Sequence, residues 1–193
     1  MKGVRQENNG KRTSPITFRV PADLVRDLRE EAEDSRVSLN TLTNQLLDRY
    51  VRWERHSNKL GLIPMTRPFL KEALRNLAEE EIKQMARNGS KEALKELVLL
   101  SKGNFSIDSF ISVFNEWLKA SWMAHRYEYD GESHNYVIHH ELGTKWSLYI
   151  AELLTAIFEE LTNIEPEVDV RDDSVSLSVK ATSEELRKRK ENY

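Results

Sequence analysis

The sequence predicts a mainly helical fold with a small β component, divided into two domains. Near the N-terminus, one short alternating strand is followed by two helical patterns, which indicates a small first domain. A segment broken by glycine and prolines follows, over residues 58–67. Beyond it, helical stripes and two hairpin patterns indicate an α+β domain over residues 68–180, with a small antiparallel sheet packed on helices.

The first predicted element is a short strand, Ile-Thr-Phe-Arg-Val, closed by a proline. Its alternation places Ile16, Phe18 and Val20 on one face, and Thr17 and Arg19 on the other. A lone strand leaves its backbone N–H and C=O groups unsatisfied, and so small an apolar face cannot form a core. We therefore expect the strand to pair antiparallel with the same strand of a second chain.

The outer face of such a two-stranded ribbon carries Thr17, Arg19 and their symmetry mates. A ribbon of this width fits the major groove of DNA, and arginine and threonine side chains are suited to contact base edges there. The strand therefore predicts double-stranded DNA as a partner and a homodimer as the unit that binds it.

Together with the helices that follow, these residues resemble the ribbon-helix-helix transcriptional regulators of the Arc/MetJ/CopG type. The resemblance runs without gaps from Ile16 to about Trp53. It rests on the strand and its proline, on a first helix with inward apolar residues, and on Val-Ser-Leu-Asn-Thr at the start of a second helix. It implies an intertwined dimer formed by residues 15–57, the ribbon-helix-helix domain.

The resemblance also implies which residues contact DNA. Base contacts fall to Thr17 and Arg19, and phosphate contacts fall to the start of the second helix: Ser38, Leu39 and Asn40. The chain departs from the family pattern at two positions. Pro15 stands where an outward polar residue is common, and Arg36 stands where a glycine commonly ends the first helix.

The phosphate contact has an independent physical basis in the second helix. Ser38 is a good N-cap, and the first turn of a helix has amide groups without helical partners. These amides and the positive end of the helix dipole attract an anion. The alternative is that Ser38 only caps the helix. The apolar surface of this helix exceeds what one small helix can cover, which supports an intertwined dimer.

Charge is distributed unevenly along the chain, whose net charge is −3. Residues 1–59 contain 12 Lys or Arg and 9 Asp or Glu, so this part carries +3 and the remainder carries −6. Residues 1–14 form a predicted flexible basic arm, in which Lys11 and Arg12 could contact the phosphate backbone or simply be solvated. Residues 181–193 are expected to be a charged tail.

Composition also limits the location and chemistry of the protein. The chain contains no cysteine, which favours an intracellular location and excludes thiolate metal sites. No apolar run approaches the roughly 20 residues of a membrane span, and the N-terminus lacks the apolar core of a signal peptide. We therefore expect a cytoplasmic protein without membrane contact.

Three helices are expected at the start of the second domain. The first covers residues 68–88 and ends near Gly89, the second is capped by Ser90 and stops at Gly103, and the third starts near Ser106. The candidate inward positions of the first are Phe69, Ala73, Leu77, Ile82 and Met85.

The remaining elements are a hairpin, a long helix and two strands. The hairpin is expected over residues 125–130 and 134–141, the helix over 146–161, and the strands over 167–170 and 175–179. The last strand alternates apolar residues with serine, so one sheet face is either wet or in contact with a partner.

The residues give no support for catalysis or for a metal. His139 and His140 are adjacent in a strand and point to opposite faces, so we interpret them, with His125 and His134, as ordinary surface or sheet histidines. No glycine-rich phosphate loop, nucleophile elbow or HExxH pattern occurs. We therefore expect no enzyme, no cofactor and no metal. The aromatic residues of this domain could line a small-molecule pocket or form plain core.

Taken together, these patterns predict a sequence-specific DNA-binding transcriptional regulator such as a repressor, acting as a homodimer or higher assembly. Its second domain is expected to oligomerise or to sense a small-molecule or protein effector. The alternative is an antitoxin-like protein-interaction module, in which the second domain captures a protein partner and DNA binding is secondary.

Overall fold

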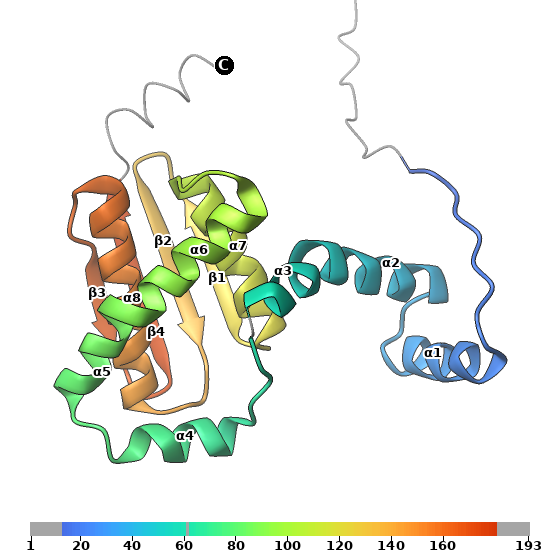
Figure 1. Cartoon of the computed structure of the whole chain (residues 1–193), viewed down its shortest axis with the longest axis horizontal. Helices are drawn as coiled ribbons and strands as arrows, with labels where there is room; N and C mark the ends of the chain where they lie inside the picture. Colours follow the sequence, from blue (N-terminus) through green and yellow to red (C-terminus); the bar gives the residue numbers. More distant parts are fainter. Residues whose placement is uncertain (1–12, 61, 181–193) are drawn as a thin grey trace, which may run out of the picture. The chain divides into compact units, whose positions relative to one another are not determined.

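The computed structural model describes residues 13–60 and 62–180. It is mainly helical with one small antiparallel sheet, which confirms the coarse fold class predicted above (Figure 1). Contacts divide the chain into two compact units, Met1–Leu46 and Leu47–Tyr193.

The first unit contains helix α1 (Ala22–Asp34) and most of helix α2 (Leu39–Arg49), preceded by an irregular segment, residues 13–21. The buried apolar side chains among its described residues are Ala32 and Leu42. Two buried side chains are a very small core for one chain.

The turn between α1 and α2 places Arg36 in the left-handed conformation, with φ of +54°. The Arg36 amide donates to the Glu33 carbonyl at 3.0 Å, and the Val37 amide donates to the Ala32 carbonyl at 2.9 Å. These two bonds are the usual helix ending that favours glycine. The turn therefore keeps its geometry without glycine, at a cost of about 1 kcal/mol for the left-handed arginine.

Arg36→Gly is therefore expected to stabilise the first unit by about 0.5–1 kcal/mol, because glycine removes the strain but adds entropy to the unfolded chain. Slower amide hydrogen exchange in α1 and early α2 would report the gain. Asn163 ends α8 with φ of +55° and provides a matched control, because asparagine tolerates this conformation. We expect Asn163→Gly to stabilise less; faster exchange in Arg36→Gly would contradict the strain argument.

The second unit contains most of the helices. After α2 they are the π-helical turn η1 (Tyr50–Glu54), α3 (Arg55–Ser57), the 3-10 turn η2 (Asn58–Leu60), α4 (Arg67–Arg75), α5 (Glu79–Met85), the π-helical turn η3 (Ala86–Ser90), α6 (Lys91–Lys102), α7 (Ile107–Ala120) and α8 (Thr144–Thr162). Trp53, where the resemblance to the ribbon-helix-helix family ends, packs against the core of this unit.

The predicted single helix over residues 68–88 is wrong in two places: it is interrupted before Ala78, and it does not end near Gly89. The helix breaks before Ala78, which has an extended backbone. The Ala78 N–H donates a hydrogen bond to the Glu81 carboxylate at 2.7 Å, and this cap starts a new helix. No break occurs at Gly89, because the π-helical turn η3 carries the helix through it. A Cβ at Gly89 would meet nothing within 4 Å, so packing does not require a glycine there.

The inward face of α4 also differs from the prediction. Leu74 is buried, whereas Ala73 and Phe69 are exposed. Of the later candidates, Ile82 is fully buried. Met85 is exposed, since the buried position in that turn belongs to its neighbour Ala86.

The sheet has four antiparallel strands in the order β1-β2-β4-β3. The strands are β1 (Ala124–Tyr129), β2 (Ser133–His139), β3 (Glu167–Val170) and β4 (Ser174–Lys180). Each hairpin pairs neighbours in the chain, and β2 pairs with β4 at the centre with Tyr136 opposite Leu177. The predicted hairpin, long helix and final strands are therefore all present.

Helices α7 and α8 cover one face of the sheet (Figure 1). The core lies in this layer, where Phe110 stacks on Phe114 with ring centroids 5.3 Å apart and meets Phe158 edge-on at 5.5 Å. Alternate residues of β2 and β4, such as Ile138 and Leu177, complete it. The opposite sheet face carries Ser174, Ser176 and Ser178, which are half-buried rather than covered.

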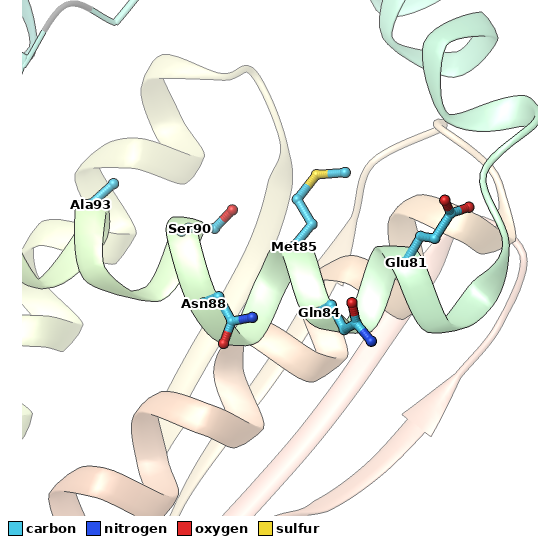
Figure 2. Close-up of a pocket in the computed structure, with 7 residues that line it drawn as sticks. Glu81, Gln84, Met85, Asn88, Ser90 and Ala93 are labelled. Atoms are coloured by element: carbon cyan, nitrogen blue, oxygen red, sulfur yellow. The ribbon is translucent and has the colours of Figure 1, made fainter.

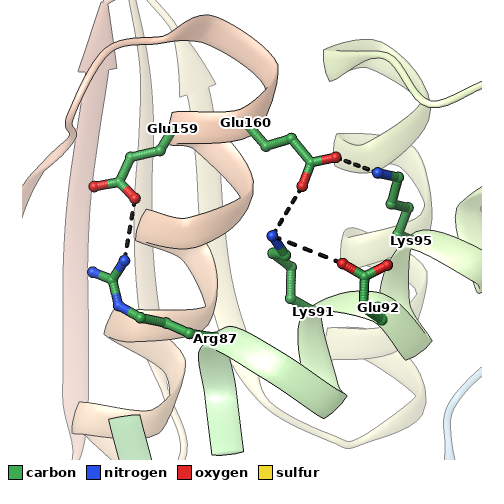
Figure 3. Close-up of polar contacts among 6 residues, drawn as sticks. All are labelled: Arg87, Lys91, Glu92, Lys95, Glu159 and Glu160. Carbon is green, nitrogen blue, oxygen red and sulfur yellow. Dashed lines mark hydrogen bonds and ion pairs between the residues drawn. The ribbon is translucent and has the colours of Figure 1, made fainter. Parts of the chain in front are cut away.

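Ion pairs join α8 to η3 and α6 (Figure 3). Arg87 lies 3.3 Å from Glu159, Lys91 lies 3.1 Å from Glu160, and Lys95 also bonds to Glu160. The hydrogen bond from Lys95 lowers the pKa of the Glu160 carboxyl below its ordinary value. Pairs as exposed as these contribute little individually, typically 0–1 kcal/mol, so they orient the helices more than they stabilise them.

Within the described ranges, no single helix is long and apolar enough to cross a membrane. The runs Glu79–Lys102 and Ile107–Ala120, bent by 104°, meet that test of length and composition only as a pair.

Candidate nucleic-acid interface

The predicted ribbon segment forms no strand within the single chain. Residues 13–21 are irregular, and every one of them is exposed. The side chains of Ile16 and Phe18 are 69% and 57% exposed, which is unusual for such apolar residues. The segment is neither helical nor packed inside one subunit, so the expected pairing with a second chain stays a prediction.

Thr17 and Arg19 lie in this exposed segment, one residue to either side of Phe18. In an extended chain, neighbouring side chains point to opposite faces, so these two share the face that Phe18 does not. Ser38, Leu39 and Asn40 lie instead at the start of α2. Over residues 13–60, no described hydrogen bond or ion pair joins the two groups. Lys11 and Arg12 lie outside the described residues.

Ser38 caps α2 as predicted. Its Oγ accepts the Thr41 amide at 3.0 Å and lies 2.8 Å from the Thr41 hydroxyl, while its carbonyl accepts the Leu42 amide at 2.9 Å. The bond from Leu42 is the first bond of the helix itself, so the amides before it have no carbonyl partner one turn earlier, and Ser38 Oγ satisfies that of Thr41. The amides of Leu39 and Asn40 also lie in this first turn, at the positive end of the helix dipole.

Many apolar side chains in and near α1 and α2 are exposed. In the first unit these are Val20 and Leu24, in addition to Ile16 and Phe18. Leu47, Tyr50 and Val51, which follow in α2 and η1, are exposed as well. In the first unit alone, this number of exposed apolar side chains is typical of surfaces that associate.

Three of the four histidines from His125 to His140 form hydrogen bonds within the protein. His134 is buried and its Nδ1 lies 2.8 Å from the Tyr127 hydroxyl. His125 donates from Nδ1 to the Met123 carbonyl at 2.9 Å. His139 is exposed and His140 is buried, so the two adjacent rings do point to opposite sides. Among the residues that the structure describes, no three His, Asp or Glu side chains gather as metal ligands.

His140 belongs to a buried network that the sequence pattern did not reveal. The Leu142 amide donates to His140 Nδ1 at 3.1 Å, so the proton of the neutral ring is on Nε2, which donates to Ser147 Oγ at 2.8 Å. Ser147 donates in turn to the Asp172 carbonyl at 3.2 Å. Desolvation by burial lowers the pKa of His140 to about 4. The adjacent histidine pair in an alternating strand signalled that one ring would be buried, but not its partners.

Two open depressions lie on the second unit. One, of about 550 Å³, follows a single helical run from Glu81 to Ala93, with Gln84, Met85 and Asn88 along it (Figure 2). The other, of about 580 Å³, lies between α4 and the start of α8. Small-molecule sites normally enclose most of the ligand surface, which neither depression does. Several aromatic residues of this unit, such as Phe110, Phe114 and Tyr136, form core instead.

The chain matches no protein-family model, and a search of curated proteins finds no similar sequence. The candidate interface therefore rests on the residues of this chain alone.

Proposed function

We propose that this protein is a sequence-specific, double-stranded DNA-binding transcriptional regulator that inserts a dimeric β-ribbon into the major groove. One observation carries the proposal: an exposed segment that alternates Ile16, Phe18 and Val20 with Thr17 and Arg19, directly before two helices. Pairing this segment with its copy hides the apolar side chains and satisfies the backbone. The same step presents arginine and threonine on one ribbon face, where they can contact base edges.

The start of α2 supports the proposal as a phosphate contact. The amides of Leu39 and Asn40 and the dipole of the helix attract an anion, and Ser38 fixes the first turn in place. Phosphate contacts of this kind position a protein on DNA without reading the sequence. Base contacts from Thr17 and Arg19 then supply the specificity, and the second unit supplies assembly or a response to an effector.

Arg19→Ala is expected to weaken binding to a selected operator by about 1–3 kcal/mol and to relax specificity at one base pair of each half-site. The physical reason is the loss of a bidentate hydrogen bond to a base edge. The operator is first obtained by selection from random DNA with the unaltered protein. Binding is then titrated at one fixed salt concentration, because phosphate contacts depend strongly on salt.

Arg26→Ala is the matched control, because it removes the same charge from the outer side of α1. The Arg26 side chain is 67% exposed and lies 3.2 Å from Asp27. We expect little change in operator affinity and no change in specificity. Equal losses for Arg19→Ala and Arg26→Ala would show that only overall charge matters, and the proposed base contact would then be wrong.

A further inference from the structure

Strand β1 forms one edge of the sheet, and it differs from the strand at the other edge. It is paired with β2 over its six residues in one continuous register. The opposite edge, β3, has four residues and follows directly after Pro166. Short strands and prolines protect an edge from pairing with another chain, and β1 has neither.

The hydrogen bonds of the β1–β2 hairpin fix which backbone groups point outward. The Asp130 amide donates to the Ser133 carbonyl at 3.3 Å, so this pair is a hydrogen-bonded pair of the ladder. Such pairs alternate along antiparallel strands, so Glu128 and Arg126 also bond toward β2. The backbone N–H and C=O groups of residues 125, 127 and 129 therefore point toward the outer edge.

We propose that β1 pairs antiparallel with β1 of a second copy of this chain, about a two-fold axis at Tyr127. Residue 125 then stands opposite residue 129 of the copy, and residue 127 stands opposite itself. All three are positions whose backbone groups point outward, so each forms a hydrogen-bonded pair of the new ladder. The two sheets join into one continuous sheet of eight strands, and both β1 edges are satisfied.

Charge selects this register. Arg126 and Glu128 lie on the uncovered sheet face, with side chains 76% and 56% exposed and 2.6 Å apart. In the proposed register each Arg126 stands directly opposite Glu128 of the copy, at a pair without hydrogen bonds, where side chains approach most closely. A shift by two residues in either direction instead places Arg126 opposite Arg126 or Glu128 opposite Glu128. Like charges in directly opposite positions destabilise a sheet.

Trp122 provides a second, independent observation. It lies two residues before β1, and at 79% it is the most exposed large apolar side chain in the described part of the chain. Its φ of +54° is strained for so bulky a residue, and Arg67 holds its carbonyl at 2.8 Å. In the proposed register Trp122 falls beside the hairpin turn of the copy, at residues 130–132. Tryptophan is enriched at the contacts that matter most in protein interfaces.

The test uses the full chain with Phe18→Asp, which removes the separate pairing proposed for the first unit. Sedimentation velocity is expected to show that this variant is still a dimer. Adding Arg126→Glu or Glu128→Arg is expected to weaken that dimer at least about tenfold, because both symmetric pairs become repulsive. An equimolar mixture of these two variants is expected to dimerise again, as is the double exchange Arg126→Glu/Glu128→Arg.

The matched control reverses an equivalent pair at the other edge of the sheet, where Arg171 lies 2.9 Å from Asp169. We expect Arg171→Glu to leave the dimer unchanged. A Phe18→Asp chain that sediments as a monomer would overturn the proposal, and would leave the edge open to a strand of another protein. The proposal would also be overturned if the charge reversals left the dimer unchanged, or if the equimolar mixture of the two variants failed to dimerise. None of these results depends on whether the protein binds DNA.

Discussion

Phe18→Asp is expected to abolish pairing of the first unit and, with it, operator binding. Full burial of a phenylalanine side chain is worth about 1.5–3 kcal/mol, and each dimer buries two of them. An aspartate also introduces two charges into the paired face. The dissociation constant of this pairing should therefore rise at least about 100-fold. Sedimentation in an Arg126→Glu background measures this pairing separately from association through β1.

The single chain should tolerate this change, because Phe18 is already 57% exposed in it. Circular dichroism and thermal unfolding are expected to match those of the unaltered protein. Ile63→Asp is the matched control, since Ile63 is a comparably exposed apolar residue outside the segment. It should change neither pairing nor operator affinity. If Phe18→Asp retained both, the ribbon would be wrong, and with it the proposed way of binding DNA.

The second large effect is a loss of stability in mild acid that depends on His140. Its ring accepts the Leu142 amide at Nδ1, and a proton added there would face that N–H group. Burial lowers the pKa of His140 to about 4, from an ordinary value of 6.5. Asp173 opposes this shift, whereas His139 and Arg67 add to it.

The sign of the pH dependence follows from these values. Between pH 6.5 and pH 4 the unfolded chain binds a proton at His140 that the folded chain does not, so folding becomes less favourable as the pH falls. The stabilisation is fully present above pH 6.5 and is lost progressively toward pH 4. A shift from 6.5 to about 4 corresponds to roughly 3 kcal/mol.

Urea unfolding of the unaltered chain and of His140→Gln across this pH range measures the effect. The variant should be less stable at neutral pH, and the difference between the two proteins should shrink as the pH falls. His139→Gln is the control, because it removes the neighbouring exposed histidine without touching the buried network. A difference between the unaltered protein and His140→Gln that stayed constant with pH would contradict the assignment of a neutral, buried ring.

The sequence predicted the elements whose apolar spacing is regular and uninterrupted. The long helix α8 and both hairpins were expected from residues such as Trp146, Ile150 and Val175, and all three are present. Prediction failed where local signals competed. Gly89 predicts a helix end, but a π-helical turn continues the helix through it. The three glutamates after Ala78 are typical of a helix start, but the apolar spacing predicts one continuous helix through them.

The candidate site could be predicted only in part, for a physical reason. Ser38 as a cap follows from residue type and spacing, and the structure confirms it. The proposed ribbon depends on a contact between two chains, and a single chain cannot show such a contact. The network around His140 joins residues up to 32 positions apart in the sequence, from His140 to Asp172, and no local periodicity reports such a contact.

The π-helical turn at Ala86–Ser90 has a consequence for how this fold can change over evolution. A π-helical turn contains one residue more than an α-helical turn, so this helix has one extra residue within its packed length. Insertions and deletions are normally confined to surface loops. Here a one-residue difference in length can be taken up within the helix itself, leaving the segments on either side in place against α8.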